Sequence, residues 1–115
     1  ENMTGETSPL FNIMPEILLR PFTEVEAKIF VNEKSQQAGF SKNEQALFLE
    51  FAAISHADGK PVWPPMRLQL VGQMLLIEKR QAMEERRTFA RNDPVYQANF
   101  KTRLEEQYKA VVKKP

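Results

Sequence analysis

The only histidine of the chain, His56, lies in a polar segment that also contains Ser55 and Asp58. A His–Asp pair can orient an imidazole as a general base, and a neighbouring serine is a nucleophile that such a base can activate. No second base or other nucleophile lies near them in the sequence. A histidine at a helix C-terminus also meets free carbonyls and the helix dipole. We therefore expect a helix-end role for His56, no catalytic residues, and a protein that is not an enzyme.

Metal and phosphate sites have no visible pattern either. Asp58-Gly59 lacks the further carboxylates of a calcium loop, and no histidine pair has the spacing of a zinc site. The four glycines are widely separated, so no glycine-rich phosphate loop exists. The absence of cysteine excludes disulfides, a thiol nucleophile and cysteine-based zinc sites. We expect no cofactor and no metal.

The elements that position these residues start with two capping boxes, residues 23–26 (TEVE) and 41–44 (SKNE). In each, a hydroxyl residue and a glutamate three positions later satisfy free N–H groups reciprocally. The first predicted helix covers about residues 24–37 and stops before Gly39, which is placed to end it. The second covers about residues 43–56, and its wide apolar surface predicts the most buried helix. The first helix is expected to place three apolar residues on one face: Val25, Ile29 and Phe30.

Turn-forming residues and the only tryptophan, Trp63, share the segment 58–65 (DGKPVWPP). A helix can begin at Pro64 or Pro65, because proline is tolerated in the first turn. No helix breaker follows before residue 92, so the third helix is expected over about residues 65–91. Asp93 followed by Pro94 then begins a fourth helix over about residues 94–112.

These patterns predict an all-α fold of about four helices with a short extended N-terminal arm. At 115 residues we expect a flexible arm over residues 1–15 and one helical domain over residues 16–115, with a projecting C-terminal helical hairpin. Residues 16–20, followed by proline, favour an extended segment that pairs at an edge. The apolar runs are too short to cross a bilayer and no secretory signal is visible, so we expect no membrane contact.

The fourth predicted helix carries a narrow apolar stripe, typical of a helix pair or a coiled-coil seam. We favour a partner chain or the projecting half of the third helix as the surface that this stripe contacts, over an ordinary intrachain core. Trp63 is open to both interpretations, a core side chain or an exposed anchor. The predicted partner or oligomer contacts are Trp63, Phe100, Leu104, Tyr108 and Val111.

Charge is distributed unevenly along the chain. Residues 1–56 hold four basic and eight acidic side chains, whereas residues 57–115 hold twelve basic and seven acidic ones. This asymmetry suits head-to-tail self-association or an acidic partner. An alternative function is a small accessory protein that binds nucleic acid through a basic helix, although interleaved glutamates neutralise much of that surface. Its contacts would be Lys79, Arg80, Arg86, Arg87 and Arg91.

Two segments share features with one known family. Residues 16–26 (EILLRPFTEVE) combine a short strand, an Arg-Pro-hydrophobic-Thr sequence and an acidic helix start. Residues 51–63 (FAAISHADGKPVW) combine an apolar helix with an Asp-Gly-Lys-Pro turn and an aromatic residue. Together they resemble the tail assembly chaperones of lambda-like long-tailed phages, over about residues 16–77. The chain departs from that pattern at Pro64-Pro65, where many relatives have an acidic segment.

The resemblance implies a non-catalytic function in a phage or prophage. Such a chaperone covers the tape measure protein, a long helical chain prone to aggregation, before the tail tube polymerises around it. It is expected to act as a homo-oligomer in the cytoplasm of the bacterial host and to leave the finished tail. A helical domain can do this by offering apolar grooves to amphipathic helices.

Overall fold

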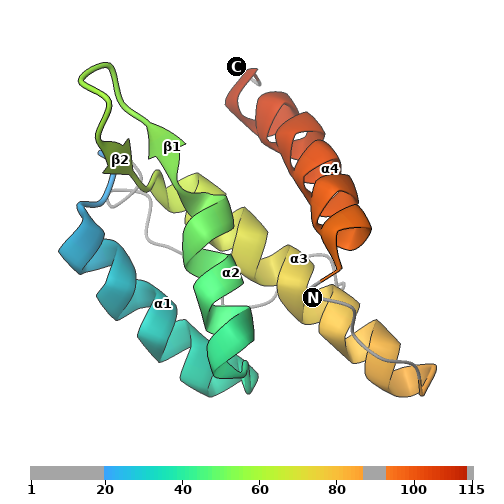
Figure 1. Cartoon of the computed structure of the whole chain (residues 1–115). Helices are drawn as coiled ribbons and strands as arrows, with labels where there is room; N and C mark the ends of the chain where they lie inside the picture. The colour runs from blue at the N-terminus through green and yellow to red at the C-terminus, as the bar shows by residue number, and fades with distance from the viewer. Residues whose placement is uncertain (1–19, 87–92, 114–115) are drawn as a thin grey trace, which may run out of the picture.

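The computed structural model describes residues 20–86 and 93–113, with side chains in the last helix described as far as Val111. Figure 1 shows four helices and one two-stranded sheet. The helices are α1 (Glu24–Ala38), α2 (Lys42–Ala52), α3 (Pro65–Glu84) and α4 (Pro94–Lys113), and the strands are β1 (Ile54–Ser55) and β2 (Pro61–Val62). The predicted all-α fold of four helices is confirmed. The expected arm, residues 1–15, lies outside the described residues.

Both predicted capping boxes are present. The Thr23 hydroxyl accepts from the N–H of Glu26, whose carboxylate accepts in return from the N–H of Thr23. Ser41 and Glu44 make the same pair of bonds at the start of α2. Gly39 ends α1 with φ 75°, a left-handed conformation that glycine adopts without steric cost.

The second helix ends at Ala52, four residues before the predicted end at His56. Ala53 is extended, and Ile54 pairs with Val62 in an antiparallel hairpin. The N–H of His56 donates to the carbonyl of Lys60 at 2.8 Å, and this bond extends the pairing into the turn. The hairpin ends the helix because strand pairing satisfies backbone groups that a longer helix would use.

The third helix ends at Glu84, although the sequence predicts a helix to residue 91. Arg86 has φ 56°, a left-handed conformation that stops helical hydrogen bonding, and residues 87–92 lie outside the described part of the chain. At its start, Pro64 is the N-cap and Pro65 the first helical residue, as the two prolines predict.

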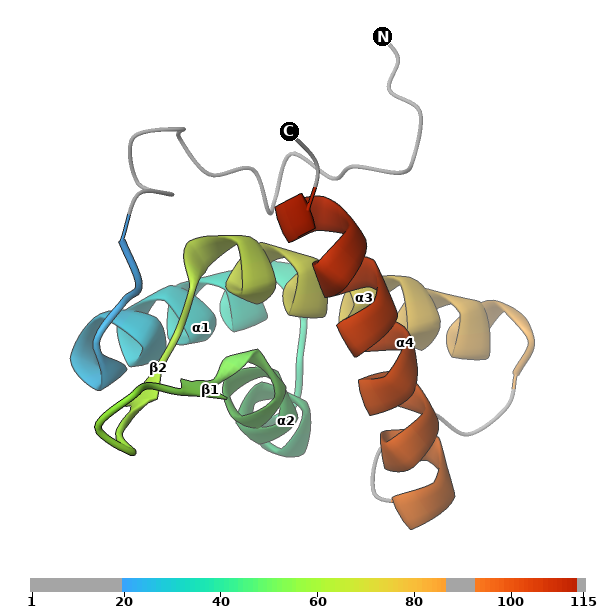
Figure 2. The same ribbon diagram turned by 90° about the horizontal axis from the view of Figure 1, so that it is seen from above.

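α2 and α3 lie between α1 and α4, and the last turns of α3 extend away from α1 and α2 (Figures 1 and 2). The core between the helices is built mainly from aromatic and leucine side chains. Its largest fully buried members are Phe48, Phe100, Leu68, Leu75 and Leu104. Burying each of them stabilises the fold by about 1.5–3 kcal/mol relative to exposure.

Phe22 and Trp63 join the entry of α1 to the end of the hairpin. Their backbones form an isolated antiparallel bridge, with N···O distances of 2.8 and 3.1 Å. The two segments that resemble the tail chaperones are therefore hydrogen-bonded neighbours in space. The edge pairing predicted for residues 16–20 stays a prediction, because residues 16–19 lie outside the described residues and the observed bridge is at Phe22.

Candidate helix-binding site

The residues that could do acid–base chemistry lie on the exposed hairpin. His56 Nδ1 lies 3.6 Å from Asp58 Oδ1, and both side chains are more than half exposed. Asp58 Oδ1 also accepts the N–H of Lys60 at 3.0 Å, a bond that closes the turn. The expected helix-end role of His56 is wrong, because α2 ends at Ala52. Among the described residues, no group of three or more His, Asp and Glu side chains is placed to hold a metal ion.

Three of the five predicted partner contacts are buried within the chain itself. Trp63 is 5% exposed, and its indole N–H donates to the carbonyl of Leu49 at 2.8 Å. Phe100 and Leu104 are fully buried, and the Phe100 ring stacks on Phe51 with centroids 4.8 Å apart. The expectation that these three side chains form a partner surface is therefore corrected, since they belong to the core.

The other two predicted contacts, Tyr108 and Val111, lie nearer the surface. Val111 is 37% exposed and Tyr108 is half-buried. The stripe of α4 thus packs its first half against the chain's own core and leaves its last turns accessible. The Tyr108 ring lies beneath the guanidinium of Arg67, 5.1 Å from its centroid.

A buried arginine links α2, α3 and α4. Arg67 Nε donates to the carbonyl of Phe51 at 3.0 Å, and Nη2 donates to Glu105 Oε2 at 2.7 Å. The guanidinium lowers the pKa of the Glu105 carboxyl, chiefly through this hydrogen bond. We call Arg67, Phe51, Glu105 and Tyr108 the Arg67 joint. It fixes the position of α4 and occupies the polar groups that another ligand would need.

The five residues of the predicted basic strip do not form one described surface. Lys79 turns towards α2, where Nζ donates to Glu44 at 2.7 Å and to the carbonyl of Gly39 at 2.8 Å. Arg80 and Arg86 are exposed. Arg87 and Arg91 lie outside the described residues.

α1 has apolar residues on two opposite faces. Ala27 and Val31 are buried against the core. Val25 and Ile29 are 68% and 56% exposed, because a shift of two positions turns a side chain through about 200° around a helix. The predicted common face of Val25, Ile29 and Phe30 is therefore wrong: only Phe30 packs inward, edge-on to Phe48.

An open groove of about 500 Å³ lies between α1 and α2, and we call it the α1–α2 groove. Val31, Ala46 and Leu49 supply its apolar lining. Two lysines, Lys28 and Lys42, are the charged residues that line it, and its described lining contains no acidic residue. Such a groove suits an apolar segment with negative charge.

Polar contacts bound this groove on each helix. Gln45 Nε2 donates to Asn32 Oδ1 at 3.3 Å and joins the two helices. Lys28 Nζ lies 3.0 Å from Glu24 one turn earlier, and both side chains are about 60% exposed. An exposed ion pair of this kind contributes only about 0.3–0.5 kcal/mol to stability. Another carboxylate can therefore readily replace Glu24 as the partner of Lys28.

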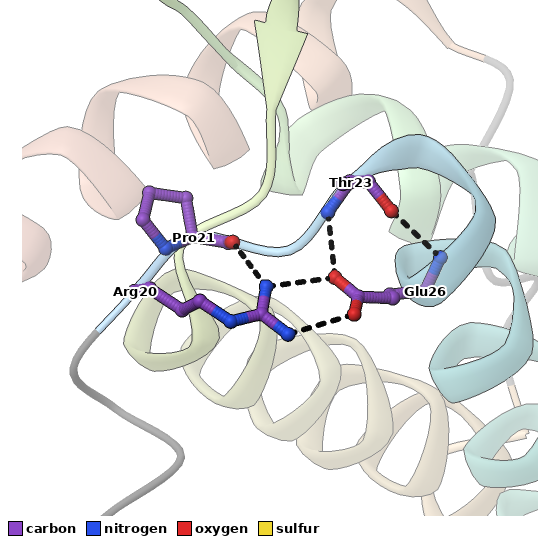
Figure 3. A network of polar contacts seen from close by, with 4 residues as sticks. All are labelled: Arg20, Pro21, Thr23 and Glu26. Carbon is purple, nitrogen blue, oxygen red and sulfur yellow. Dashed lines mark hydrogen bonds and ion pairs between the residues drawn. The ribbon is translucent and has the colours of Figure 1, made fainter.

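A smaller hollow of about 260 Å³ lies on the other flank of α1, beside Ile29, Phe30 and Glu33. Glu26, which also lines it, binds the Arg20 guanidinium through both carboxylate oxygens at 3.0 and 2.8 Å (Figure 3). This bond, with the N–H of Thr23, lowers the pKa of Glu26 to about 2. The chain therefore enters α1 in a fixed position on the acidic flank of the helix.

Sequence reasoning missed both the α1–α2 groove and the outer face of α1. The spacing Ala27, Val31, Ser35 and Ala38 marks the inward stripe of α1, but its small residues give a weaker signal than Val25 and Ile29.

No helix in the described part of the chain has both the length and the apolar character needed to span a membrane. Comparison with protein-family models, with curated proteins and with solved structures finds no match to this chain.

Proposed function

We propose that this protein is a non-catalytic chaperone that holds an amphipathic helix of a partner protein. By the resemblance of residues 16–77, the partner is a phage tape measure protein and the setting is tail assembly in the cytoplasm of a bacterial host. Self-association into a homo-oligomer belongs to the same proposal. Its accessible candidates for contact between copies are Tyr108 and Val111 at the end of α4.

The α1–α2 groove is the observation that carries this proposal. It is open, has an apolar lining and carries two lysines, so it suits the apolar stripe of a helix with acidic residues beside it. The exposed side chains of Val25 and Ile29 extend the apolar area across the outside of α1. Contiguous exposed apolar surface is typical of a site that receives a partner.

The nucleic-acid alternative receives less support from the geometry. Lys79 is bonded to Glu44, and two of the other four cations lie outside the described residues. Near Arg80, the described hollow is also lined by Glu84 and Glu85. Acidic groups beside the cation weaken its attraction for phosphates.

A binding experiment with paired variants tests the proposed function. The probe is a fluorescently labelled helical segment of a lambda-like tape measure protein, with acidic residues beside its apolar stripe, and the assay is fluorescence anisotropy. Ala46 is exposed in the groove, whereas Val95 is 66% exposed on α4. We expect A46E to weaken binding at least tenfold, because it adds bulk and negative charge to the groove, and V95E to leave it unchanged.

Anisotropy measurements with a second probe, a labelled 30-base-pair DNA duplex at increasing salt concentration, separate the two candidate functions. Affinity for the duplex that falls steeply with salt, together with no binding of the helical probe, would establish the nucleic-acid alternative. Light scattering of the wild-type protein over a concentration series tests self-association. A monomer at all concentrations would remove the oligomer from the proposal.

A further inference from the structure

The α1–α2 groove sets clear requirements for whatever fills it. Its lining offers Val31, Ala46 and Leu49 for apolar contact and the ammonium groups of Lys28 and Lys42 for charge. A suitable occupant is therefore apolar, carries negative charge and lacks basic residues that the lysines would repel.

The N-terminal segment of this chain meets those requirements. Residues 1–19 contain three glutamates and no lysine, arginine or histidine. Between residues 10 and 19, seven positions are apolar: Leu10, Phe11, Ile13, Met14, Ile17, Leu18 and Leu19. Glu16 lies between the two apolar clusters. Residues 43–55 have a similar composition, but they lie in α2 and β1, and α2 forms one wall of the groove.

The described structure also fixes where this segment is attached. Arg20 is held by Glu26, and Phe22 is hydrogen-bonded to Trp63, so the chain leaves the domain beside the first turn of α1. The groove residues of α1, Lys28 to Asn32, lie about 6–12 Å further along the helix axis at 1.5 Å per residue. Crossing the helix adds about 10 Å.

The path along and across α1 is about 16–22 Å, and the five residues 15–19, when extended, span about 16–18 Å. Residues 15–19 are therefore long enough to cross the outer face of α1 to the near end of the groove; Val25 and Ile29 are exposed on that face. Residues 10–14 then reach the groove. A short tether gives a local concentration in the millimolar range, which favours the chain's own arm over the arm of another copy.

We propose that residues 10–19 fold back over α1 of the same chain and occupy the α1–α2 groove. Ile17, Leu18 and Leu19 cover Val25 and Ile29, and the cluster from Leu10 to Met14 packs into the groove. Glu16 lies near Lys28 and replaces Glu24 as the carboxylate that pairs with this lysine. Where the groove also binds a partner helix, the arm and the partner compete for it, and partner binding releases the arm.

Disulfide trapping tests this arrangement directly, because the chain has no cysteine of its own. The test pair is N12C with A46C, which keeps every apolar side chain of the arm and uses an exposed groove position. The control pair is N12C with V95C on α4, at the opposite end of the helix arrangement from α1 (Figures 1 and 2).

Under mild oxidation, we expect the test pair to close within one chain at least tenfold faster than the control pair. Non-reducing electrophoresis and mass spectrometry identify the product. Equal rates for the two pairs overturn the proposal. A disulfide formed mainly between chains also overturns it, because it assigns the groove to the arm of another copy.

Limited proteolysis gives an independent measurement on full-length chains. Chymotrypsin cleaves after Phe11 only when the arm is undocked, so the cleavage rate reports the undocked fraction. We expect K28Q with K42Q to raise this rate roughly up to fivefold, because Glu16 loses its one exposed ion pair, with Lys28, and the nearby positive charge of Lys42. The matched control, K60Q with K109Q, removes two exposed lysines outside the groove and should leave the rate unchanged.

An unchanged rate in the K28Q/K42Q protein overturns the role of these lysines in holding the arm. Both tests use the free protein and no partner. Failure of the arm proposal thus leaves the proposed chaperone function standing, and failure of the helical probe to bind leaves the arm result unaffected.

Discussion

Replacing Arg67 by methionine tests whether the Arg67 joint holds α4 on the rest of the domain. Three interactions are lost together: the 3.0 Å hydrogen bond to the carbonyl of Phe51, the ion pair with Glu105 and the cation–π contact with Tyr108. Methionine preserves most of the apolar stem of the buried side chain. The loss therefore reports the polar interactions rather than a cavity.

The expected magnitude follows from the burial of each partner. Leaving the Phe51 carbonyl without its donor costs about 1–3 kcal/mol. The cation–π contact contributes about 0.5–1 kcal/mol. The Glu105 side chain is 55% exposed, so its ion pair with Arg67 contributes about 0.5–1 kcal/mol, far below the value for a fully buried pair. Together, R67M should lower the free energy of unfolding by about 2–5 kcal/mol.

Urea unfolding, followed by circular dichroism and by the fluorescence of Trp63, measures this free energy. R80M, at an exposed position of α3, is the matched control and should change it by less than about 0.5 kcal/mol. E105Q should cost about 1 kcal/mol or less, because it keeps an acceptor for Arg67. The reasoning fails if R67M lies within 1 kcal/mol of the wild type, or if E105Q costs as much as R67M.

The pH dependence of the same joint has a defined sign. The Arg67 guanidinium lowers the pKa of Glu105 in the folded state, so the stabilising contribution is complete above the ordinary glutamate pKa. It is lost as pH falls through the lowered, folded-state pKa. The free energy of unfolding of E105Q should therefore decline less steeply below about pH 4.5 than that of the wild type.

Three further substitutions test other contacts. R20M should raise the pKa of Glu26 from about 2 towards its ordinary value, measured by NMR titration, because the main interaction that lowers it is removed. An unchanged Glu26 pKa would contradict the bidentate contact. K79M should lower the free energy of unfolding in urea by about 2–4 kcal/mol, since Glu44 is only 3% exposed and loses its ion pair. G39A should lower the melting temperature by about 4–8 °C, because the backbone angle φ of 75° costs a residue with a Cβ about 1 kcal/mol. No neighbouring atom obstructs the added Cβ, so the backbone angle is the cause of this cost. An unchanged melting temperature would indicate that α1 ends differently.

Local hydrogen-bond chemistry made the helix starts predictable. A capping box such as Thr23 to Glu26 satisfies its own backbone donors within four residues, so its geometry depends little on the rest of the chain. The end of α2 was not predictable in this way. Ile54 and Ser55 fit the apolar helical pattern, and only their pairing with Pro61 and Val62 across the turn makes them strands.

The candidate site depended on tertiary placement, which periodicity does not contain. The stripe of Phe100 and Leu104 was visible in the sequence, but whether it meets a partner or its own chain depends on where α2 presents Phe51. Likewise, Val25 and Ile29 have the spacing of a core stripe. They face outward because Ala27 and Val31 allow α1 to approach α2 and α3 more closely.

Two contacts between aromatic residues, Phe22 with Trp63 and Phe51 with Phe100, form at different times during synthesis of the chain. Phe22 is translated 41 positions before Trp63, its bridge partner, and Phe51 is translated 49 positions before Phe100. At about 5–20 residues per second, each gap lasts roughly 2–10 s on the ribosome. A nascent chain therefore completes α1, α2 and the hairpin first and presents the uncovered ring of Phe51 for seconds, until α4 emerges.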